Sequence, residues 1–528
     1  MSGFRFGIDR LLEDSSALSG RRVALLSHPA GVTSSLEPSW QALSKAPGVR
    51  LVKLFGPEHG IDGSAQDMIQ VSDWLHRGSG LPARSLYGAT FSSLSPSAAD
   101  LADVDLLVCD LQDVGSRYYT FVWTICLAIE ACARRGVEVV VCDRPNPLGE
   151  RREGEPQKLE GLSFVGLHPV PVRHGRTIGE LAEIFARDRD LPRPRVVRMK
   201  QWARHDGWPS GAFFLPPSPN MPTLDTAAVY PGACLVEATN LSEGRGTTRP
   251  FEQVGAPYLG ARKLAAAMNE RGLPGVRFFP THFRPTFQKF AGEVCHGVFW
   301  RVDDAATFRP YETGLRLLET VRSLWPADFR WRSEPYEFES RPAIDLLTGS
   351  SEFRQRLDAG ENLEDFYARQ ESPQPDPVSF YAERRPALLG VAGDHDSGKT
   401  TLLERLVPQL RARGWKVGAV KHTPHDVEDD VPGKDSFRHR AAGAEPAAFL
   451  RPSSATLRRN GGESLDVWIE REFGDCEIVL VEGFHALPID RIEVGRARTR
   501  SVEFGGREFG EDLAALGEAI ARHFGLDP

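Results

Sequence analysis

The sequence is poor in cysteine and has no long apolar run. Seven cysteines occur in 528 residues and none forms a C-x-x-C pair, which argues against a disulfide framework or a cysteine-based zinc site. No stretch approaches the roughly 18 uncharged apolar residues of a membrane-spanning helix, and residues 1–20 lack the apolar core of a signal peptide. We therefore expect buried, reduced thiols in a cytoplasmic protein with no membrane partner.

The sequence also lacks an excess of positive charge. Its 64 Lys and Arg stand against 72 Asp and Glu, and the net charge is −8. Such a chain has no overall basic field, so we expect no nucleic-acid partner. A hydrophobic fraction of 41% and a charged fraction of 26% are typical of folded protein. The length predicts about two to four domains.

Four short apolar runs in the first part of the chain predict the strands of a parallel sheet. They cover 21–27, 49–55, 104–110 and 137–143, and a helical pattern that ends at Gly136 separates the last two. Near-continuous apolar strands alternating with helices indicate an α/β fold whose sheet is covered on both faces. Polar residues follow each run, at the sheet edge where ligands of such folds bind.

Several of these polar residues are carboxylates, which suggests glycoside hydrolysis. A pair of carboxylates on opposite sides of a glycosidic bond is the minimum that this reaction requires. The candidates are Glu58, Asp110, Asp113, Asp143 and Glu237. Helix caps and solvated loops use the same residue types, so the pattern alone does not select the reaction. The absence of G-x-G-x-x-G and G-x-S-x-G argues against a dinucleotide site and an α/β-hydrolase.

Residues from about 5 to 384 resemble the exo-acting N-acetylmuramidase family of the NamZ or YbbC type. The matching segments are "FGPEHG", "SLYG", "DLQDVGSRYYTF", "CDRPNPLG", "VPVRHGRTIGELA", "LPPSPNMPT", "YPGACLVEATNLSEGRGTTRPFE" and "SRPAIDLLTG". The resemblance implies a Rossmann-like catalytic domain over 1–235 and an auxiliary α+β domain over 236–370. It also implies release of terminal N-acetylmuramic acid (MurNAc) from peptidoglycan fragments, without a cofactor.

The resemblance also assigns roles to candidate residues. Glu58 of "GPEHG" is the expected catalytic acid/base, and Glu237, which we expect at the end of a strand "ACLVE", is the expected second carboxylate, with Asp113 as its competitor. Arg117 is the first choice to hold the lactyl carboxylate of MurNAc, because a guanidinium matches a carboxylate bidentately. Further candidates for substrate contact are Arg173, Arg245, His59, Tyr118, Asn146, His174 and Asn240.

A glycine-rich motif near the C-terminus predicts a nucleotide site. Residues 393–400 satisfy G-x-x-x-x-G-K-[ST] between an apolar run and a helical pattern, which is the context of a P-loop. It indicates a P-loop NTPase α/β domain over 386–528, after a proline-rich linker over 371–385. The expected phosphate contacts are Gly393, Asp396, Ser397, Gly398, Lys399, Thr400 and Thr401. Thr400 and Glu482, which ends the run "CEIVLVE", are the expected Mg²⁺ ligands.

This last part resembles the MobB family of P-loop proteins, which is linked to molybdopterin guanine dinucleotide synthesis. The matching segments are "GDHDSGKTTL", "AVKHTPHD", "GKDSFRHRAAGA" and "VEGFHALPIDRIEV". The resemblance implies GTP binding with Mg²⁺, slow GTP hydrolysis, and partnership with a MobA-like molybdopterin guanylyltransferase. We also expect a homodimer through this domain.

Three hypotheses follow for the whole chain. The first is a bifunctional fusion of a muramidase-like hydrolase with a MobB-like GTPase. The second is a GTP-regulated binding protein whose sugar-hydrolase domain is catalytically inactive. The third is that the reading frame joins two genes in error.

Overall fold

The chain forms two compact units, residues 1–380 and residues 381–528. We call them the N-terminal unit and the C-terminal unit, and describe each by itself. The computed structural model describes the chain from residue 4 to residue 524, apart from 64–73, 201, 203, 205–206, 371–386, 394–396, 423–441, 443–446, 451–453, 456–458, 461–472, 474–475, 477, 483–489, 495–501 and 510–511. The predicted linker over 371–385 lies outside the described residues.

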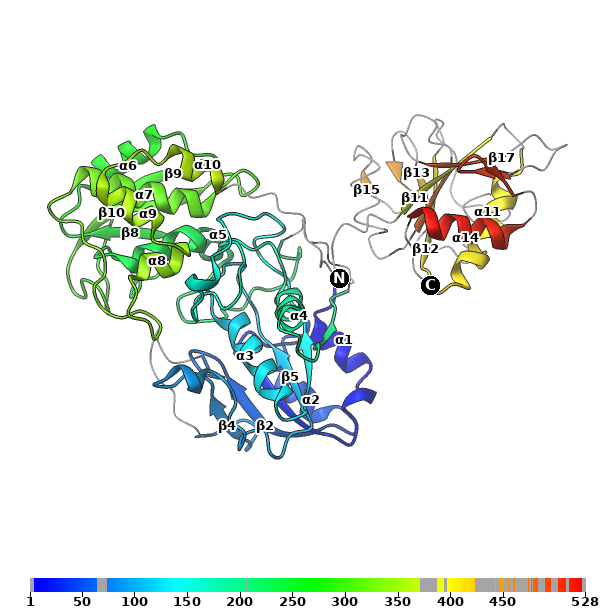
Figure 1. Ribbon diagram of the computed structural model, residues 1–528, viewed down its shortest axis with the longest axis horizontal. Coiled ribbons are helices and arrows are strands. Elements are labelled where there is room, and N and C mark those ends of the chain that lie inside the picture. Colours follow the sequence, from blue (N-terminus) through cyan, green and yellow to red (C-terminus); the bar gives the residue numbers. More distant parts are fainter. Residues whose placement is uncertain are drawn as a thin grey trace. The chain divides into compact units, whose positions relative to one another are not determined.

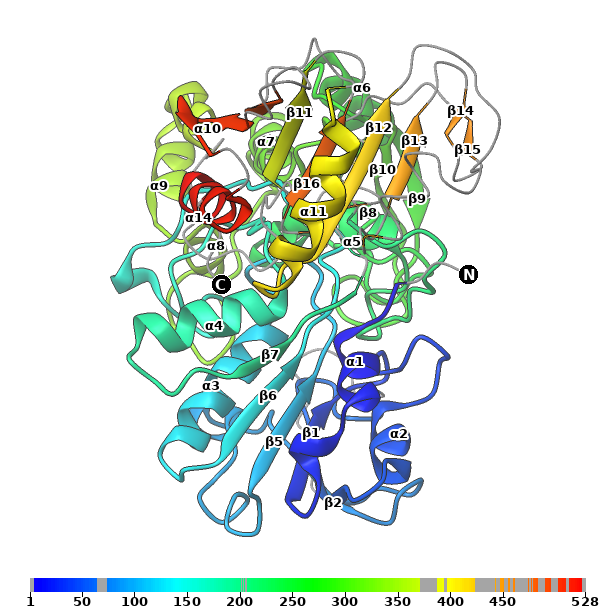
Figure 2. The same cartoon turned by 90° about the vertical axis from the view of Figure 1, so that its right-hand side faces the viewer.

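The N-terminal unit is built on a seven-stranded sheet in the order β3-β4-β2-β1-β5-β6-β7. Every neighbouring pair is parallel except β3 and β4, as in a Rossmann-like fold (Figure 2). All four predicted strands are confirmed, as β1, β2, β5 and β6. The bounds are β1 Arg22–Ser27, β2 Arg50–Gly56, β3 Trp74–Leu75, β4 Pro82–Ser85, β5 Leu106–Asp110, β6 Glu138–Cys142 and β7 Arg195–Val197.

Helices cover both faces of this sheet. Figures 1 and 2 show α3 and α4 on one face and α1 and α2 on the other. Helix α3 is buried along almost its whole length, which explains why its sequence is apolar all round. Helix α4 begins with a capping box between Thr177 and Glu180. The bounds are α1 Gly7–Glu13, α2 Ser39–Lys45, α3 Phe121–Ala133 and α4 Ile178–Asp188.

The segment "ACLVE" is helical, so its prediction as a strand is wrong. Helix α5 spans Leu224–Ala233 and continues directly into a 3₁₀ helix over Cys234–Ala238, which carries Glu237. All five residues of the 3₁₀ helix are buried. A short apolar run has the same pattern in a buried helix as in a buried strand, so its period does not distinguish the two.

The rest of the N-terminal unit is an α+β region. Its antiparallel sheet has the order β8-β10-β9, with β8 Gln253–Ala256, β9 Val276–Phe283 and β10 Cys295–Val302. The helices are α6 Ala261–Glu270, α7 Pro310–Leu324, α8 Ala343–Thr348, α9 Glu352–Ala359 and α10 Glu364–Arg369. One continuous hydrophobic core joins this region to the parallel sheet.

The C-terminal unit contains a nine-stranded sheet in the order β15-β14-β13-β12-β16-β11-β17-β18-β19. Its strands are β11 Ala387–Ala392, β12 Val417–His422, β13 Ala447–Leu450, β14 Ser454–Ala455, β15 Arg459–Asn460, β16 Ile478–Glu482, β17 Arg491–Val494, β18 Val502–Phe504 and β19 Arg507–Glu508. Strands β13, β12, β16, β11 and β17 run parallel. Helices α11 Lys399–Arg411 and α14 Leu513–Phe524 contribute to one core with this sheet. The architecture is the predicted P-loop α/β type.

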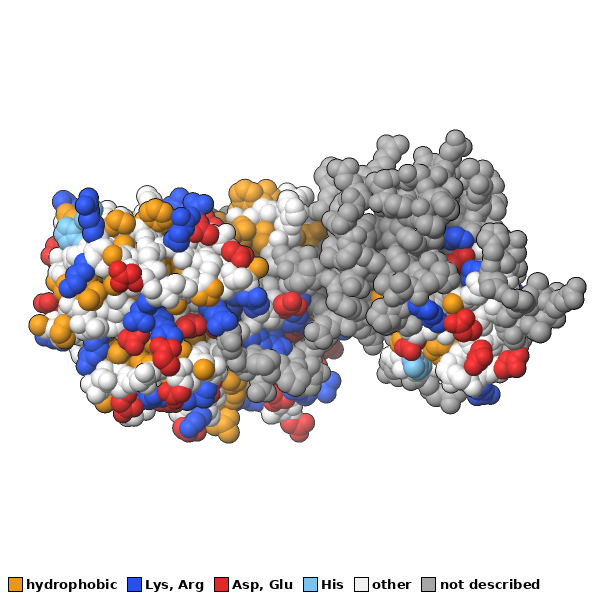
Figure 3. Space-filling model, turned by 90° about the horizontal axis from the view of Figure 1, so that it is seen from above, with side chains coloured by type: hydrophobic (Ala, Val, Ile, Leu, Met, Phe, Trp, Pro, Cys, Tyr) orange, Lys and Arg blue, Asp and Glu red, His pale blue; other side chains and the backbone are white. Residues whose placement is uncertain are grey.

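Cysteines and charges are distributed as the composition indicated. All seven cysteines are buried and free of disulfides. On the face of the N-terminal unit visible in Figure 3, basic and acidic side chains are interspersed. Among the described residues, no helix is both long and apolar enough to cross a bilayer.

Candidate active site and candidate nucleotide site

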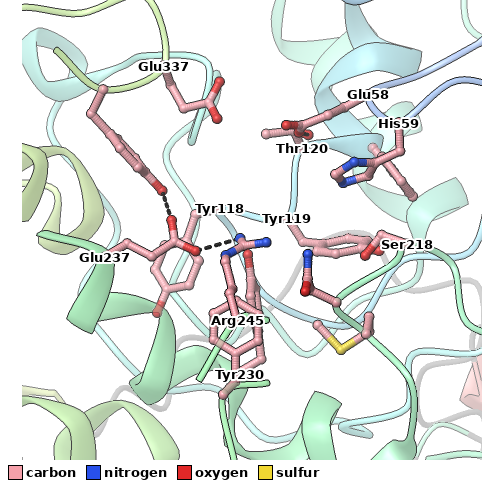
Figure 4. Close-up of a pocket in the computed structure, with 15 residues that line it drawn as sticks. Glu58, His59, Tyr118, Tyr119, Thr120, Ser218, Tyr230, Glu237, Arg245 and Glu337 are labelled. Atoms are coloured by element: carbon pink, nitrogen blue, oxygen red, sulfur yellow. Dashed lines mark hydrogen bonds and ion pairs between the residues drawn. The ribbon is translucent and has the colours of Figure 1, made fainter. Parts of the chain in front are cut away.

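A pocket in the N-terminal unit collects residues from the parallel-sheet part and from the α+β part (Figure 4). The space between its lining residues is about 450 Å³ and includes open solvent. Three of the lining side chains are carboxylates. The lining consists of Glu58, His59, Tyr118, Tyr119, Thr120, Phe121, Ser218, Asn220, Met221, Tyr230, Glu237, Arg245, Phe251, Tyr336 and Glu337.

Glu58 reaches the pocket from the turn that follows strand β2. The backbone N–H of Gly60 donates to the carbonyl of Pro57 at 2.9 Å and closes the turn, and His59 adopts a left-handed backbone with φ of +72°. The glutamate is buried, and the Thr120 hydroxyl donates to its Oε2 at 3.0 Å. The carboxyl end of a parallel strand therefore supplies the first acid of the pocket, as the sequence predicts.

Glu237 supplies the second acid, from the 3₁₀ helix after α5. Its Oε1 accepts a hydrogen bond from Nη2 of Arg245 at 2.7 Å, and its Oε2 accepts one from the Tyr336 hydroxyl at 2.8 Å (Figure 4). Burial alone would raise the pKa of Glu237, but the Arg245 guanidinium and the Tyr336 hydroxyl outweigh burial and lower this pKa below its ordinary value. Glu237 is consequently a carboxylate anion at neutral pH.

Glu337 supplies the third acid, from a tight turn in the α+β part. The Tyr87 hydroxyl donates to its Oε2 at 3.1 Å. Figure 4 shows Glu58, Glu237 and Glu337 around the same space. Glu337 is not among the sequence-based candidates, although it lies three residues before the segment "SRPAIDLLTG". No local pattern marks it, because neither a strand nor a helix precedes it.

Four tyrosines line the pocket as neutral hydroxyl groups. Burial raises the pKa of Tyr118, Tyr119, Tyr230 and Tyr336 well above the ordinary value. They therefore keep their protons, and the Tyr336 hydroxyl donates a hydrogen bond to Glu237. Tyr118 was a sequence-based candidate and lines the pocket, but its hydroxyl donates to the carbonyl of Pro231. Ser218 and Asn220, from the segment "LPPSPNMPT", were missed as individual residues.

Asp113 and His174 lie outside the pocket lining and contact each other. The distance from Nε2 of His174 to Oδ2 of Asp113 is 3.1 Å, and the backbone N–H of Gly115 donates to the same Oδ2 at 2.7 Å. Both side chains are buried. Of the two candidates for the second carboxylate, Glu237 lines this pocket and Asp113 does not.

Arg117, the first choice to hold a lactyl carboxylate, lies outside the pocket lining. It is fully buried, and its guanidinium donates to the carbonyls of Val170 at 3.1 Å and Leu347 at 2.6 Å. A guanidinium committed to backbone carbonyls in the core stabilises the fold and is inaccessible to a ligand. Of the three arginine candidates, only Arg245 lines the pocket, since Arg173 donates to the carbonyl of Leu148.

Two asparagine candidates also hold loops together and do not line the pocket. Asn146 donates from Nδ2 to the carbonyl of Arg176 at 2.9 Å, and its Oδ1 accepts from the backbone N–H of Leu148. Asn240 donates to the carbonyl of Asp328 and accepts from the Tyr258 hydroxyl. Sequence patterns do not separate an Asn that ties a loop from one that meets a ligand.

In the C-terminal unit, the predicted P-loop connects strand β11 to helix α11. Gly393 has φ of +148°, and a Cβ there would lie 2.6 Å from both Oγ of Ser397 and the carbonyl oxygen of Val494. Gly398 precedes the helix with φ of +96°. The Oγ of Ser397 is buried and has no hydrogen-bond partner among the described residues. This cradle and the orphan hydroxyl fit a phosphate at the helix N-terminus.

Three further predicted nucleotide residues, Lys399, Thr400 and Thr401, follow this loop at the start of α11. Lys399 donates from Nζ to the carbonyl of Gly393 at 2.8 Å. Thr400 and Thr401 lie in the first turn of α11, with Thr400 half-buried and Thr401 exposed. Asp396 lies outside the described residues. A lysine followed by hydroxyl residues at these positions is the residue set with which P-loops bind phosphate and Mg²⁺.

Glu482 lies beside the P-loop and contacts a lysine. Strand β16 lies between β12 and β11, with Glu482 opposite Lys421 on one side and Val391 on the other. The Lys421 Nζ lies 2.7 Å from Oε1 of Glu482, which is buried. Glu482 thus ends the strand next to the P-loop strand, which is where P-loop proteins carry an acid that can bind Mg²⁺.

The two sites define the class of protein. One unit is a Rossmann-like α/β protein with a pocket of acids and tyrosines, and the other is a P-loop α/β protein. Residues 23–225 match the family model for the N-terminal part of the exo-beta-N-acetylmuramidase NamZ, and residues 228–389 match the model for its C-terminal part. The chain belongs to the NamZ exo-beta-N-acetylmuramidase family.

Relatives and solved structures agree with this membership. The peptidoglycan beta-N-acetylmuramidase NamZ of Bacillus subtilis is 43% identical over 365 residues, which cover 68% of this chain and 85% of the relative. A DUF1343 family protein from Bacteroides fragilis has a solved structure with a TM-score of 0.61 and 32% identity. The match covers 70% of this chain and 97% of that structure.

The C-terminal residues match a second family. Residues 388–511 match the model for molybdopterin guanine dinucleotide synthesis protein B. The molybdopterin-guanine dinucleotide biosynthesis adapter protein of Haemophilus influenzae is 38% identical over 113 residues. These residues cover 21% of this chain and 63% of that relative. The chain thus joins a NamZ-like part to a MobB-like domain.

Proposed function

We propose that the N-terminal unit is an exo-acting glycoside hydrolase that releases terminal MurNAc from peptidoglycan fragments. The observation that carries this proposal is the pocket in which Glu58 and Glu237 face the same space. Two carboxylates of different environment are what glycoside hydrolysis requires. Similarity to the muramidase of B. subtilis supports the choice of sugar.

The two carboxylates take different roles in this proposal. Glu58 is the general acid/base, which gives a proton to the leaving glycosidic oxygen as the bond to the anomeric carbon breaks. Glu237 stays ionised because Arg245 and Tyr336 bind it, and its negative charge stabilises the positive charge that develops on the sugar. A water molecule then adds to the anomeric carbon and gives a proton to the Glu58 carboxylate, which restores the acid.

Arg245 is the residue that we propose for the lactyl carboxylate of MurNAc. It is the arginine among the three sequence-based candidates that lines the pocket, and its guanidinium lies 4.9 Å from the centre of the Phe251 ring. A guanidinium held over an aromatic face is fixed in orientation, which suits recognition of a planar carboxylate. His59 and Tyr118 are the other sequence-based candidates that line the pocket.

The test uses a chromogenic β-N-acetylmuramide and compares wild type with Glu58→Gln. Loss of general acid/base catalysis is expected to lower kcat by about 10²–10⁴-fold. Glu138→Gln is the control, because Glu138 is exposed at the start of β6. Equal activity of wild type and Glu58→Gln contradicts the role of Glu58. No turnover by wild type favours the alternative of a binding protein with an inactive sugar-hydrolase domain.

For the C-terminal unit we propose binding of GTP with Mg²⁺ and slow GTP hydrolysis in molybdenum cofactor biosynthesis. Lys399 and the glycine cradle would hold the phosphates, and Thr400 and Glu482 would hold Mg²⁺. Similarity to adapter proteins of molybdopterin-guanine dinucleotide biosynthesis supports a MobA-like guanylyltransferase as partner. We also propose that the protein forms a homodimer through this domain and is located in the cytoplasm.

A further inference from the structure

The turn that carries Glu337 has an unusual backbone for its sequence. Tyr336 and Glu339 exchange two backbone hydrogen bonds, of 3.1 and 3.0 Å, so that Glu337 and Phe338 form a two-residue loop. Both loop residues have positive φ, +46° for Glu337 and +68° for Phe338. This is the pattern of a type I′ turn, in which Asn-Gly, Asp-Gly or Gly-Gly is strongly preferred. Glutamate and phenylalanine are poorly suited to both positions.

The surrounding side chains hold this strained turn in place. Phe338 packs against Tyr87 and Phe164, with ring centroids 5.8 and 6.1 Å apart. On the other side of the loop, the Tyr336 hydroxyl binds Glu237. A left-handed backbone costs roughly 1–2 kcal/mol for each residue other than glycine. Such strain persists only where the surroundings enforce it, and it concentrates at functional sites.

The strain directs one side chain into the pocket. Glu337 is 5% exposed, lines the pocket and accepts a hydrogen bond from Tyr87 at 3.1 Å. Tyr87 follows strand β4 of the parallel sheet, whereas Glu337 belongs to the α+β part, so this bond links the two parts at the pocket. A glycine or asparagine would relieve the turn, but it would not place a carboxylate at this point.

We propose that Glu337 is a third functional carboxylate of this pocket and that it contacts the substrate. It accepts hydrogen bonds from hydroxyl or amide N–H groups of the bound terminal sugar, beside Glu58 and Glu237. Tyr87 is a positioning residue that orients the carboxylate. The proposal rests on the proposed hydrolase function and adds a substrate-binding residue that local sequence pattern does not reveal.

Two substitutions separate contact with substrate from a structural role. Glu337→Gln keeps the size and the strained turn but removes the charge, whereas Glu337→Asn suits a left-handed backbone but shortens the side chain. Glu337→Gln is expected to lower kcat/KM about 10- to 100-fold, the effect of losing hydrogen bonds to a charged group, with an unchanged Tm. Glu337→Asn is expected to lose activity without a gain in Tm, because the relief of the turn is offset by loss of the Tyr87 hydrogen bond.

The control is Glu339→Gln, in the same turn. The Glu339 side chain binds Arg341 and does not line the pocket, so this variant is expected to keep wild-type kcat/KM. Wild-type kcat/KM in Glu337→Gln would overturn the proposal, and so would full activity in Glu337→Asn. No turnover by wild type would instead contradict the hydrolase function itself, so the two failures are distinguishable.

Discussion

Each unit pairs a buried glutamate with a cation at 2.7 Å, but the two pairs have different surroundings. The Glu237 and Arg245 side chains are 7% and 8% exposed, and Tyr336 and the Phe251 ring hold them from further sides. The Glu482 side chain is 4% exposed, but the Lys421 side chain is 19% exposed. The Lys421 ammonium group also lies at the end of a flexible four-carbon chain.

Because of this difference, we call Glu237–Arg245 a fixed ion pair, which keeps one geometry, and Glu482–Lys421 an exchangeable ion pair, whose members can separate. A guanidinium is planar, always charged and matched to a carboxylate, so the Glu237–Arg245 pair keeps one geometry before substrate arrives. Lysine is a strongly hydrated point charge with rotatable bonds, so the Glu482–Lys421 pair separates more readily. A pocket that stabilises developing charge needs the first kind of pair, and a site that binds and releases Mg²⁺ with its nucleotide needs the second.

The largest effect is expected from Lys399→Ala. Removal of the phosphate-facing ammonium group is expected to weaken GTP binding by at least about 100-fold, measured by calorimetry. Lys416→Ala is the matched control, because this residue precedes β12 at the edge opposite the P-loop. Muramidase activity is expected to stay at the wild-type level. Unchanged GTP binding would reject the P-loop assignment.

An intermediate effect is expected from breaking each ion pair in turn. Arg245→Met leaves the charge of Glu237 buried without its cation and is expected to lower the free energy of unfolding of the N-terminal unit by about 3–5 kcal/mol. Lys421→Met is expected to cost the C-terminal unit less, because Lys421 is 19% exposed and water can replace its ammonium group. Calorimetry on the full chain resolves these changes if the two units unfold in separate transitions. Equal costs would remove the distinction between fixed and exchangeable pairs.

The smallest effect is expected from pH. The pKa of Glu237 is lower in the folded state than its ordinary value of 4.5. A lowered pKa stabilises the folded state above pH 4.5, and this stabilisation is lost as pH falls through the folded-state pKa. The Tm of wild type is therefore expected to fall more steeply from pH 6 to pH 3 than the Tm of Glu237→Gln. Parallel curves for the two proteins would show that the pair does not depend on ionised Glu237.

Local features were predictable where the residues of one short segment are enough to determine its conformation. The four parallel strands, helix α3 and the P-loop context all follow from periodicity or from glycine spacing within a few residues. Glu58 was predictable for the same reason, because it directly follows a strand in a tight turn. The "ACLVE" segment was not, because four apolar residues before a glutamate pack equally well in a buried 3₁₀ helix and in a strand.

The candidate active-site pocket, in contrast, was decided by contacts between distant segments. From the sequence, Arg117 was preferred to Arg245 as a ligand-binding residue. In the structure, the carbonyls of Val170 and Leu347 hold Arg117 in the core, whereas Glu237 holds Arg245 at the pocket. Glu337 joins the pocket through a turn whose strain is maintained by Tyr87 and Phe164. Sequence alone was enough for the two-family organisation, the parallel strands and the phosphate loop, since these depend on neighbours along the chain. Which polar side chains meet a ligand depended on tertiary structure, because a buried polar group takes whichever partner the fold brings within hydrogen-bond distance.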